Sequence, residues 1–215
     1  MKIAILGSTG FVGSELLKKS IEKGHQIKVL ARNPGKLGEC AKSVEVVEGN
    51  YFDKDKVEKT ITGADIVISA IGPSTKKTEG TEEYEKAMTN LTASMKNQKI
   101  SRIIILGGAA TPVKDNEIFN FRQKFIGFML NMMGKYMIQI KTRECAILAA
   151  SGLDWIIVRP PRVSQGSPKN NVAAYESKLQ SMQIDRADLV DFILEQTASD
   201  TWLHKAPLVC SVKKR

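Results

Sequence analysis

The sequence has few of the residues that usually bind metals or form disulfides. Its three cysteines, Cys40, Cys145 and Cys210, are far apart and form no C-x-x-C pair, which suits a reducing compartment. The two histidines, His25 and His204, are separated by most of the chain and cannot form a metal site by themselves. We therefore predict that the protein binds no metal.

The sequence also lacks an apolar run long enough to cross a bilayer. The most apolar stretch after the first half, residues 125–138, is interrupted by Asn131, Gly134 and Lys135 and is too short to span a membrane. A glycine-rich motif begins at residue 7, which leaves no room for a cleavable leader. We therefore expect a cytoplasmic protein.

The formal net charge of +9 favours anionic partners, which include both dinucleotides and nucleic acids. The basic residues are scattered, apart from Lys76-Lys77 and the terminal Lys213–Arg215, and they form no stripe with interleaved aromatics. A solvated basic face is the preferred interpretation, and a nucleic-acid surface is the alternative.

What the sequence does contain is a strand, a glycine turn and a helix at its start. Lys2–Leu6 is a short apolar run typical of a buried parallel strand. Gly7 permits the turn out of that strand, Gly10 lets backbone approach a pyrophosphate, and Gly13 lets the helix pack close to the sheet. Gln26–Ala31 completes a βαβ unit, the context that this motif requires for a dinucleotide site. A glycine turn that binds no ligand is the alternative.

Strands and helices alternate through the rest of the chain. Further strands are predicted at 44–48, 65–71, 102–106, 154–159 and 208–211, and helices at 54–61, 82–98, 118–150 with a break near Gly134, and 187–197. This alternation predicts an α/β fold of the Rossmann type, a doubly wound parallel sheet between two helical layers with strand order 3-2-1-4-5-6. We expect residues 1–215 to form a single domain with a small C-terminal region on the substrate side.

The end of the second strand predicts which dinucleotide binds. An NAD site usually has Asp or Glu there to bind the ribose 2′-OH, but this chain reads Ala31-Arg32-Asn33. The Arg32 guanidinium can instead pair with a 2′-phosphate, and Lys36 could add a second charge. The sequence therefore favours NADPH over NADH, with Arg32 as a simple exposed cation as the alternative.

Other predicted cofactor contacts lie where strands end. Asn50 follows the third strand and could meet the adenine edge, and residues 70–72 follow the fourth strand and could pass beside the adenosine. Either segment is equally compatible with an ordinary turn. The predicted set from these motifs is Gly7, Ser8, Thr9, Gly10, Phe11, Val12, Gly13, Arg32, Asn33, Asn50, Ala70, Ile71 and Gly72.

Together these motifs resemble the atypical short-chain dehydrogenase/reductase group. The likeness rests on GSTGFVG at 7–13, the Arg32-Asn33-Pro34 turn, Gly49-Asn50, residues 70–72, SGLDWIIVRPPRV at 151–163 and IDRADLVDFIL at 184–194. The similar members are small NAD(P)H-binding proteins related to flavin reductases, biliverdin-reductase-B-like enzymes and NmrA-like regulators. The resemblance implies that Pro160 and the residues after it bring backbone groups near the nicotinamide carboxamide.

The catalytic pattern of that group, Tyr-x-x-x-Lys with Glu four residues later, is only partly present. Aligning on Glu144 places the Tyr at Tyr136 but puts Ile140 at the Lys position. Lys141 stands one residue further on, about 100° around a helix. Tyr136 is therefore a candidate for substrate polarisation, with a core aromatic as the alternative. Thr111, after the fifth strand, is a second candidate that could instead cap a turn.

An incomplete catalytic set suits an acceptor that takes a hydride readily. Phenylalanines and methionines gather at 119–137, which suits a flat aromatic acceptor or else packing in the core or a dimer interface. We therefore predict an NADPH-dependent oxidoreductase acting on a flavin, such as FMN or FAD, or a quinone, as a monomer or homodimer. The alternative is an NmrA-like redox-sensing protein that binds a dinucleotide without turnover.

Overall fold

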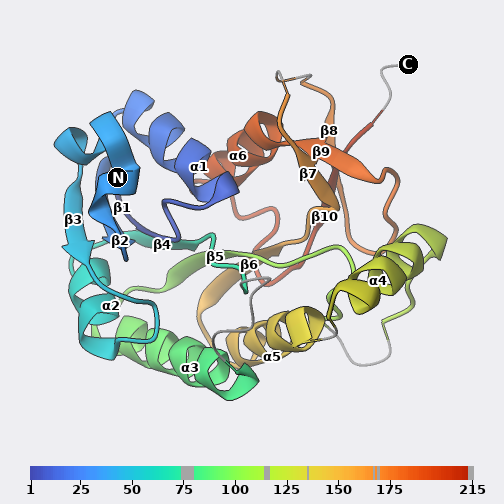
Figure 1. Ribbon diagram of the computed structural model, residues 1–215, viewed down its shortest axis with the longest axis horizontal. Coiled ribbons are helices and arrows are strands. Elements are labelled where there is room, and N and C mark those ends of the chain that lie inside the picture. The colour runs from blue at the N-terminus through green and yellow to red at the C-terminus, as the bar shows by residue number, and fades with distance from the viewer. Residues whose placement is uncertain (74–79, 114–116, 135, 167, 169, 213–215) are drawn as a thin grey trace.

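The computed structural model describes the backbone of residues 1–73, 80–113, 117–134, 136–166, 168 and 170–212, and the side chains of these residues except 130–134. Its main sheet has six parallel strands in the order β3-β2-β1-β4-β5-β6 (Figure 1). The strands are β1 (Lys2–Leu6), β2 (Gln26–Ala31), β3 (Glu45–Glu48), β4 (Ile66–Ser69), β5 (Arg102–Leu106) and β6 (Asp154–Val158). The predicted fold class and strand order are confirmed.

Helices cover both faces of this sheet (Figure 1). One layer contains α1 (Phe11–Glu22) and α6 (Arg186–Glu195), and the other contains α2 (Lys54–Ile61), α3 (Thr81–Asn97) and α5 (Tyr136–Ala149). The helix α4 (Phe121–Gly134) lies at the end of the molecule beyond β5 (Figure 1). None of the helices in the described part of the chain has the length and apolarity needed to cross a membrane.

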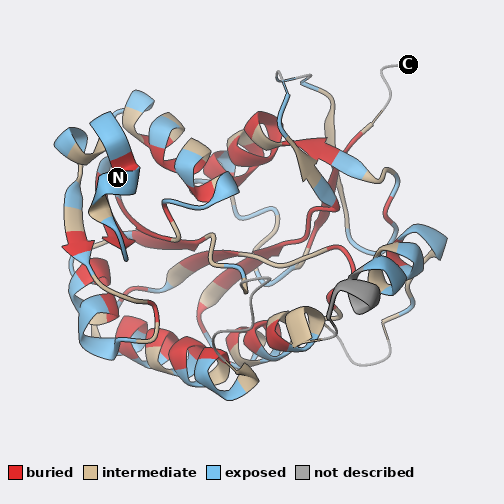
Figure 2. Ribbon diagram, in the orientation of Figure 1, coloured by how far each residue is buried: buried red, intermediate tan, exposed pale blue. Residues whose placement is uncertain are grey.

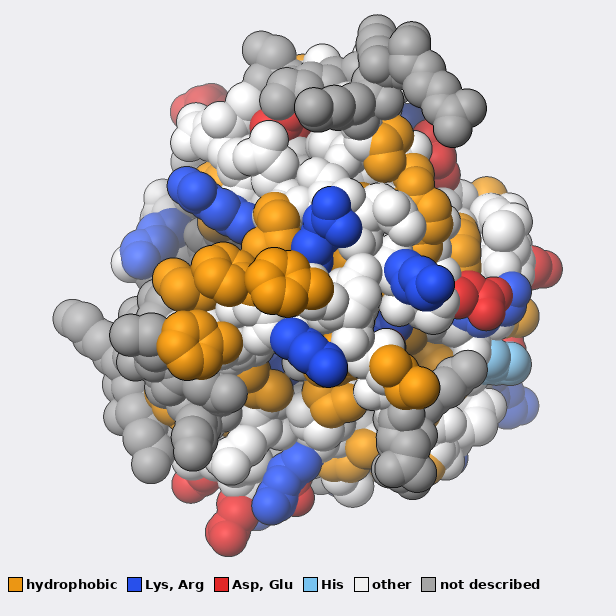
Figure 3. Space-filling view, turned by 90° about the vertical axis from the view of Figure 1, so that its right-hand side faces the viewer, with side chains coloured by type: hydrophobic (Ala, Val, Ile, Leu, Met, Phe, Trp, Pro, Cys, Tyr) orange, Lys and Arg blue, Asp and Glu red, His pale blue; other side chains and the backbone are white. Residues whose placement is uncertain are grey.

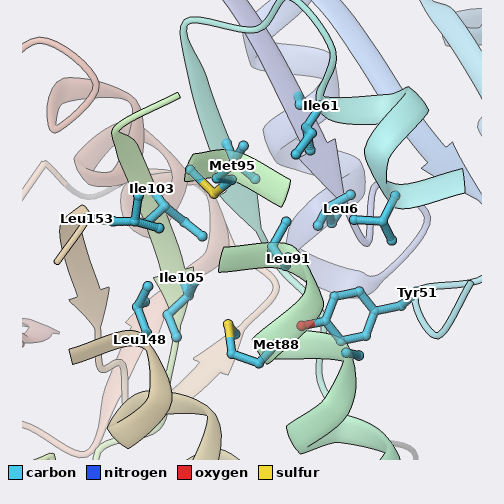
Figure 4. Packing of buried hydrophobic residues seen from close by; sticks show 14 of the residues in the cluster. Leu6, Tyr51, Ile61, Met88, Leu91, Met95, Ile103, Ile105, Leu148 and Leu153 are labelled. Carbon is cyan, nitrogen blue, oxygen red and sulfur yellow. The ribbon is translucent and has the colours of Figure 1, made fainter. Parts of the chain in front are cut away.

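The strands are apolar throughout because both faces of the sheet are buried. Along β1, Ile3 and Ile5 pack toward the layer of α1 and α6, whereas Ala4 and Leu6 pack toward the opposite layer. Figure 2 shows the sheet as the most buried part of the molecule. Figure 4 shows three side chains of α3, Met88, Leu91 and Met95, lying between Ile105 and Leu148 on one side and Leu6 and Ile61 on the other. This two-sided burial explains why the strands read as continuous apolar runs.

Several boundaries and small elements differ from the sequence-based expectations. The break near Gly134 is found, since α4 ends at Gly134 and α5 begins at Tyr136. β4 ends at Ser69 rather than residue 71. A 3-10 segment (Pro34–Ser43) and the short strands β7 (Arg162–Ser164), β8 (Val172–Tyr175) and β9 (Gln183–Asp185) were not predicted. The last strand, β10 (Leu208–Ser211), pairs with β8 in a separate small sheet.

A buried arginine ties the loops beyond β5 and β6 together. Arg159 is 2% exposed, and its guanidinium donates to the carbonyl oxygens of Ala206 at 2.9 Å and Thr111 at 3.1 Å. It also forms an ion pair with the Glu117 carboxylate at 2.6 Å. One side chain therefore joins the segment after β5 to the segment before β10.

We expect Arg159→Met to lower the free energy of unfolding by about 3 kcal/mol or more, because it leaves Glu117 and two carbonyls without their donor. Arg143→Met is the matched control, since Arg143 pairs with Glu85 at a position where its side chain is 58% exposed. That change should cost at most about 1 kcal/mol. Urea denaturation of both variants measures the difference, and equal losses would show that Arg159 does not hold these loops.

Candidate functional site

A cavity of about 230 Å³ lies at the carboxyl ends of β1 to β4. The connections that follow β1 and β4 leave the sheet in opposite directions here, which is where open α/β sheets bind ligands. Eight residues predicted as cofactor contacts line it: Gly7, Thr9, Gly10, Arg32, Asn50, Ala70, Ile71 and Gly72. Leu30, Lys36, Gly49, Tyr51, Phe52 and Tyr84 complete the lining.

Two glycines of the turn are required by the packing of the protein itself. Gly7 has φ +86°, and a Cβ there would lie 2.9 Å from the Ala70 carbonyl carbon. A Cβ on Gly13 would lie 2.0 Å from the Gly7 carbonyl oxygen. Both positions therefore exclude any side chain, and α1 starts directly over the ends of β1 and β4.

Gly10 differs from these two glycines, because a side chain there would overlap the protein far less. Its backbone is extended, with φ −79° and ψ 173°, and a Cβ there would lie 3.3 Å from the Gly7 oxygen, a tight contact that a shift of a few tenths of an ångström relieves. Gly10 is exposed and lines the cavity. The missing side chain thus leaves room in the cavity for a ligand to approach the backbone.

α1 begins beside the cavity, because its N-cap residue, Gly10, lines it. The N-cap position, Gly10, provides no side-chain hydrogen bond, and no acidic residue lies in the first turn. The first amides of a helix have no intrahelical partner and carry a partial positive charge. This end of the cavity therefore fits a pyrophosphate.

The opposite end of the cavity is cationic. Arg32, immediately after β2, and Lys36 both line it, and no carboxylate is found among the described lining residues. The Asn33 carboxamide oxygen accepts a hydrogen bond from the Gly35 amide at 3.1 Å and thereby caps the segment that carries Lys36. Asn33 supports this loop, and it does not line the cavity.

An aromatic group forms a third wall, which the sequence analysis missed. The Phe52 ring meets Tyr84 edge-on at 4.9 Å and Tyr51 at 5.7 Å between ring centroids. The Asn50 side chain accepts a hydrogen bond from the Phe52 amide at 3.3 Å and so fixes this turn. Burial, followed by the nearby Glu144 carboxylate, raises the pKa of Tyr51 well above its ordinary value. Tyr51 is therefore a neutral wall residue.

Residues 7–200 match the sequence pattern of the NAD(P)H-binding family. The chain belongs to the NAD(P)H-binding family. YwnB of Bacillus subtilis (strain 168), an uncharacterised protein, is 29% identical over 111 residues, which are 52% of this chain. The match covers 49% of YwnB, so the chain spans about half the length of this curated relative.

Solved structures share the fold at low sequence identity. A short-chain dehydrogenase/reductase from Veillonella parvula in complex with NADP has a TM-score of 0.81 and 18% identity, over 98% of this chain and 94% of the other. SP1627 of Streptococcus pneumoniae TIGR4, described as a candidate NADH-flavin reductase, has a TM-score of 0.76 and 16% identity, over 99% and 100%. These similarities show that the fold is shared.

In this member of the NAD(P)H-binding family, the catalytic lysine of the related group was expected at residue 140. The next residue, Lys141, is the one that contacts the wall of the cavity. Ile140 is 1% exposed and packs in the core. Lys141 donates from Nζ to the Ile71 carbonyl at 2.6 Å, and its Nζ lies 2.8 Å from the buried Glu144 carboxylate. The lysine therefore holds the end of β4, which lines the cavity.

The two candidate catalytic residues do not line the described cavity. Tyr136 is partly buried and packs against the core cluster at the start of α5. Thr111 is 3% exposed, and its amide donates to the Gly108 carbonyl at 2.9 Å in a turn.

The remaining predicted cofactor contacts that lie outside the lining are Ser8, Phe11, Val12, Gly13 and Pro160. Among these, Phe11 is exposed beside Arg186, whose guanidinium carbon lies 4.8 Å from its ring centroid.

We expect Gly10→Val to abolish binding of NADPH and NADH alike while leaving the fold intact, because its side chain would enter the cavity. Gly13→Val is the contrasting variant, since its side chain would overlap backbone and should destabilise the protein by roughly 1–3 kcal/mol or more. Thermal unfolding and fluorescence titration with both dinucleotides separate the two effects. Unchanged dinucleotide affinity in folded Gly10→Val would place the pyrophosphate elsewhere.

Proposed function

We propose that the protein is an NADPH-dependent reductase that transfers a hydride to a small aromatic acceptor, with a free flavin as the first choice. The observation that carries the proposal is the cationic end of the cavity. Arg32 and Lys36 lie there without a carboxylate among the described lining residues. A 2′-phosphate satisfies two such cations, whereas a ribose 2′-OH calls for the carboxylate that this site lacks.

Different residues of the cavity bind different parts of the dinucleotide. The start of α1 and Gly10 accommodate the pyrophosphate, the turn at Asn50 and the aromatic wall border the adenosine, and Arg32 selects the 2′-phosphate. NADPH, when bound, supplies the hydride. The NADP complex of the Veillonella parvula protein supports this arrangement, since that chain shares the fold.

The choice of acceptor follows from the proton donors that the site offers. Lys141 is engaged by Glu144 and the Ile71 carbonyl, so its role is to position the end of β4. Tyr136 and Thr111 remain candidates for polarising the acceptor, although neither lines the described cavity. A flavin or quinone requires little help from protein acids, and the fold shared with a candidate NADH-flavin reductase supports this class.

We also propose that residues 1–215 work as one NAD(P)-binding domain, with the small sheets of β7 to β10 as the substrate-side region. Cytoplasmic location and a monomeric or homodimeric state stay predictions. An NmrA-like sensor would bind the dinucleotide in the same cavity without consuming it, so turnover is what distinguishes the two functions.

We expect NADPH oxidation to be faster with FMN, FAD or a quinone than with simple ketones, because Ile140 occupies the position of the lysine expected for ketone reduction and the neighbouring Lys141 is held in an ion pair. Following NADPH absorbance against a panel of acceptors tests this. Tight NADPH binding with no turnover by any acceptor would favour the sensor instead. Ketone reduction that depends on Lys141 would overturn the proposed role of that residue.

We expect Arg32→Ala to weaken NADPH binding by roughly ten- to a hundredfold, since a charge-assisted hydrogen bond contributes about 1.5–3 kcal/mol. NADH lacks the 2′-phosphate, so its affinity should barely change. Lys59→Ala, which removes an exposed cation from α2, is the control for net charge. Equal weakening of both dinucleotides in titrations of Arg32→Ala would mean that the residue supports its loop and does not read the phosphate.

A further inference from the structure

Among its described side chains, the helix α4 packs one face against the protein and leaves the opposite face exposed. Its inward face carries Gln123, which is 0% exposed, and Ile126, which packs against a small cluster that includes Ala109 and Leu179. Gly127 lies on the same face, where a Cβ would be 3.7 Å from that of Ala110. This contact fixes how the helix is turned relative to the protein.

The outward face is aromatic and faces solvent. Phe121 is 82% exposed, Phe125 46%, Phe128 61% and Met129 45%. At about 100° per residue these four side chains fall within an arc of about 100°, roughly opposite the inward face. The apolar face of an amphipathic helix is ordinarily the covered one, whereas here the aromatic face is exposed. Four large apolar side chains exposed together on one helix face indicate a binding surface.

The stripe is bordered by positive charge. Arg122 and Lys124 lie at its two edges by the same helical geometry, and both are exposed. The sequence from residue 118 to residue 143 contains no aspartate or glutamate. Figure 3, which views the molecule from the α4 side, shows hydrophobic side chains gathered on this face with Lys and Arg side chains around them. The partner that complements this surface is apolar and negatively charged.

A second copy of the chain does not provide that complement. A two-fold symmetric contact through this face would place Arg122 and Lys124 of both copies together. Like charges brought together at an interface oppose association. The net charge of +9 adds repulsion between copies and attraction toward an anionic surface.

We propose that α4 docks the protein onto an anionic lipid bilayer. The helix lies in the plane of the interface, with Phe121, Phe125 and Phe128 inserted at the boundary between headgroups and acyl chains. Arg122 and Lys124 then meet the anionic headgroups from both sides of the stripe. This association is peripheral and does not depend on the proposed reductase activity.

Co-sedimentation of the full chain with vesicles tests the docking. The protein should bind vesicles of phosphatidylcholine with phosphatidylserine, bind vesicles of phosphatidylcholine alone far less, and dissociate at high salt. The double variant Phe121→Ser with Phe128→Ser should partition at least about tenfold more weakly, because it removes the inserted rings. Circular dichroism should show an unchanged fold, since both side chains are exposed.

A matched pair of variants separates local charge from net charge. Arg122→Gln with Lys124→Gln should weaken binding to the anionic vesicles by roughly tenfold or more. Lys59→Gln with Lys96→Gln removes the same charge from exposed positions on α2 and α3 and should have a much smaller effect. Equal effects of the two pairs would overturn the proposal.

Other outcomes would assign the stripe to a different occupant. If the serine variants convert a dimer to a monomer in analytical ultracentrifugation, the face is an interface between copies. If they alter the KM for a soluble acceptor but leave vesicle binding unchanged, the face is a wall of the acceptor site. Either result would overturn lipid docking, and neither depends on whether NADPH is turned over.

Discussion

The site depends on a contact between backbone segments that leaves no room for side chains. Gly13 lies so close to the Gly7 carbonyl, and Gly7 so close to the backbone of Ala70, that a single Cβ at either glycine would overlap main-chain atoms. This contact sets the start of α1 over the ends of β1 and β4, where the chain connections diverge. The opening between these strands, the orientation of the first helical amides and the position of Ala70 all follow from it.

Charged side chains around the cavity have two separate roles. Arg32 and Lys36 are exposed and lie at the cavity, where a ligand can meet them. Lys141 is paired with the buried Glu144, and Arg159 with Glu117, and these pairs hold the end of β4 and the loops beyond β6. Buried charges need such partners because desolvation penalises any that are left alone. The cations that are free to select a ligand are therefore the exposed ones.

The sequence predicted the order of the strands and about half of the residues that line the cavity, because both depend on local patterns. Apolar runs such as Lys2–Leu6 mark strands buried on both faces, and each strand end is followed by a short polar or glycine-rich turn. The place of Tyr84 in the lining and the contact of Lys141 with Ile71 could not be predicted in this way, since both side chains reach the site from the sides of helices through tertiary packing. The strands β7 to β9 have only three or four residues, too few for any periodicity to show.

The location of Arg32 has an evolutionary consequence. Arg32 is an exposed loop residue whose neighbours are held by the Asn33 cap, so replacing it disturbs no core contact. Gly7 and Gly13, by contrast, are locked by backbone contacts and can hardly vary. A lineage with this fold can therefore exchange one dinucleotide for another by a few substitutions after β2, while its capacity to bind dinucleotides at all persists through the same changes.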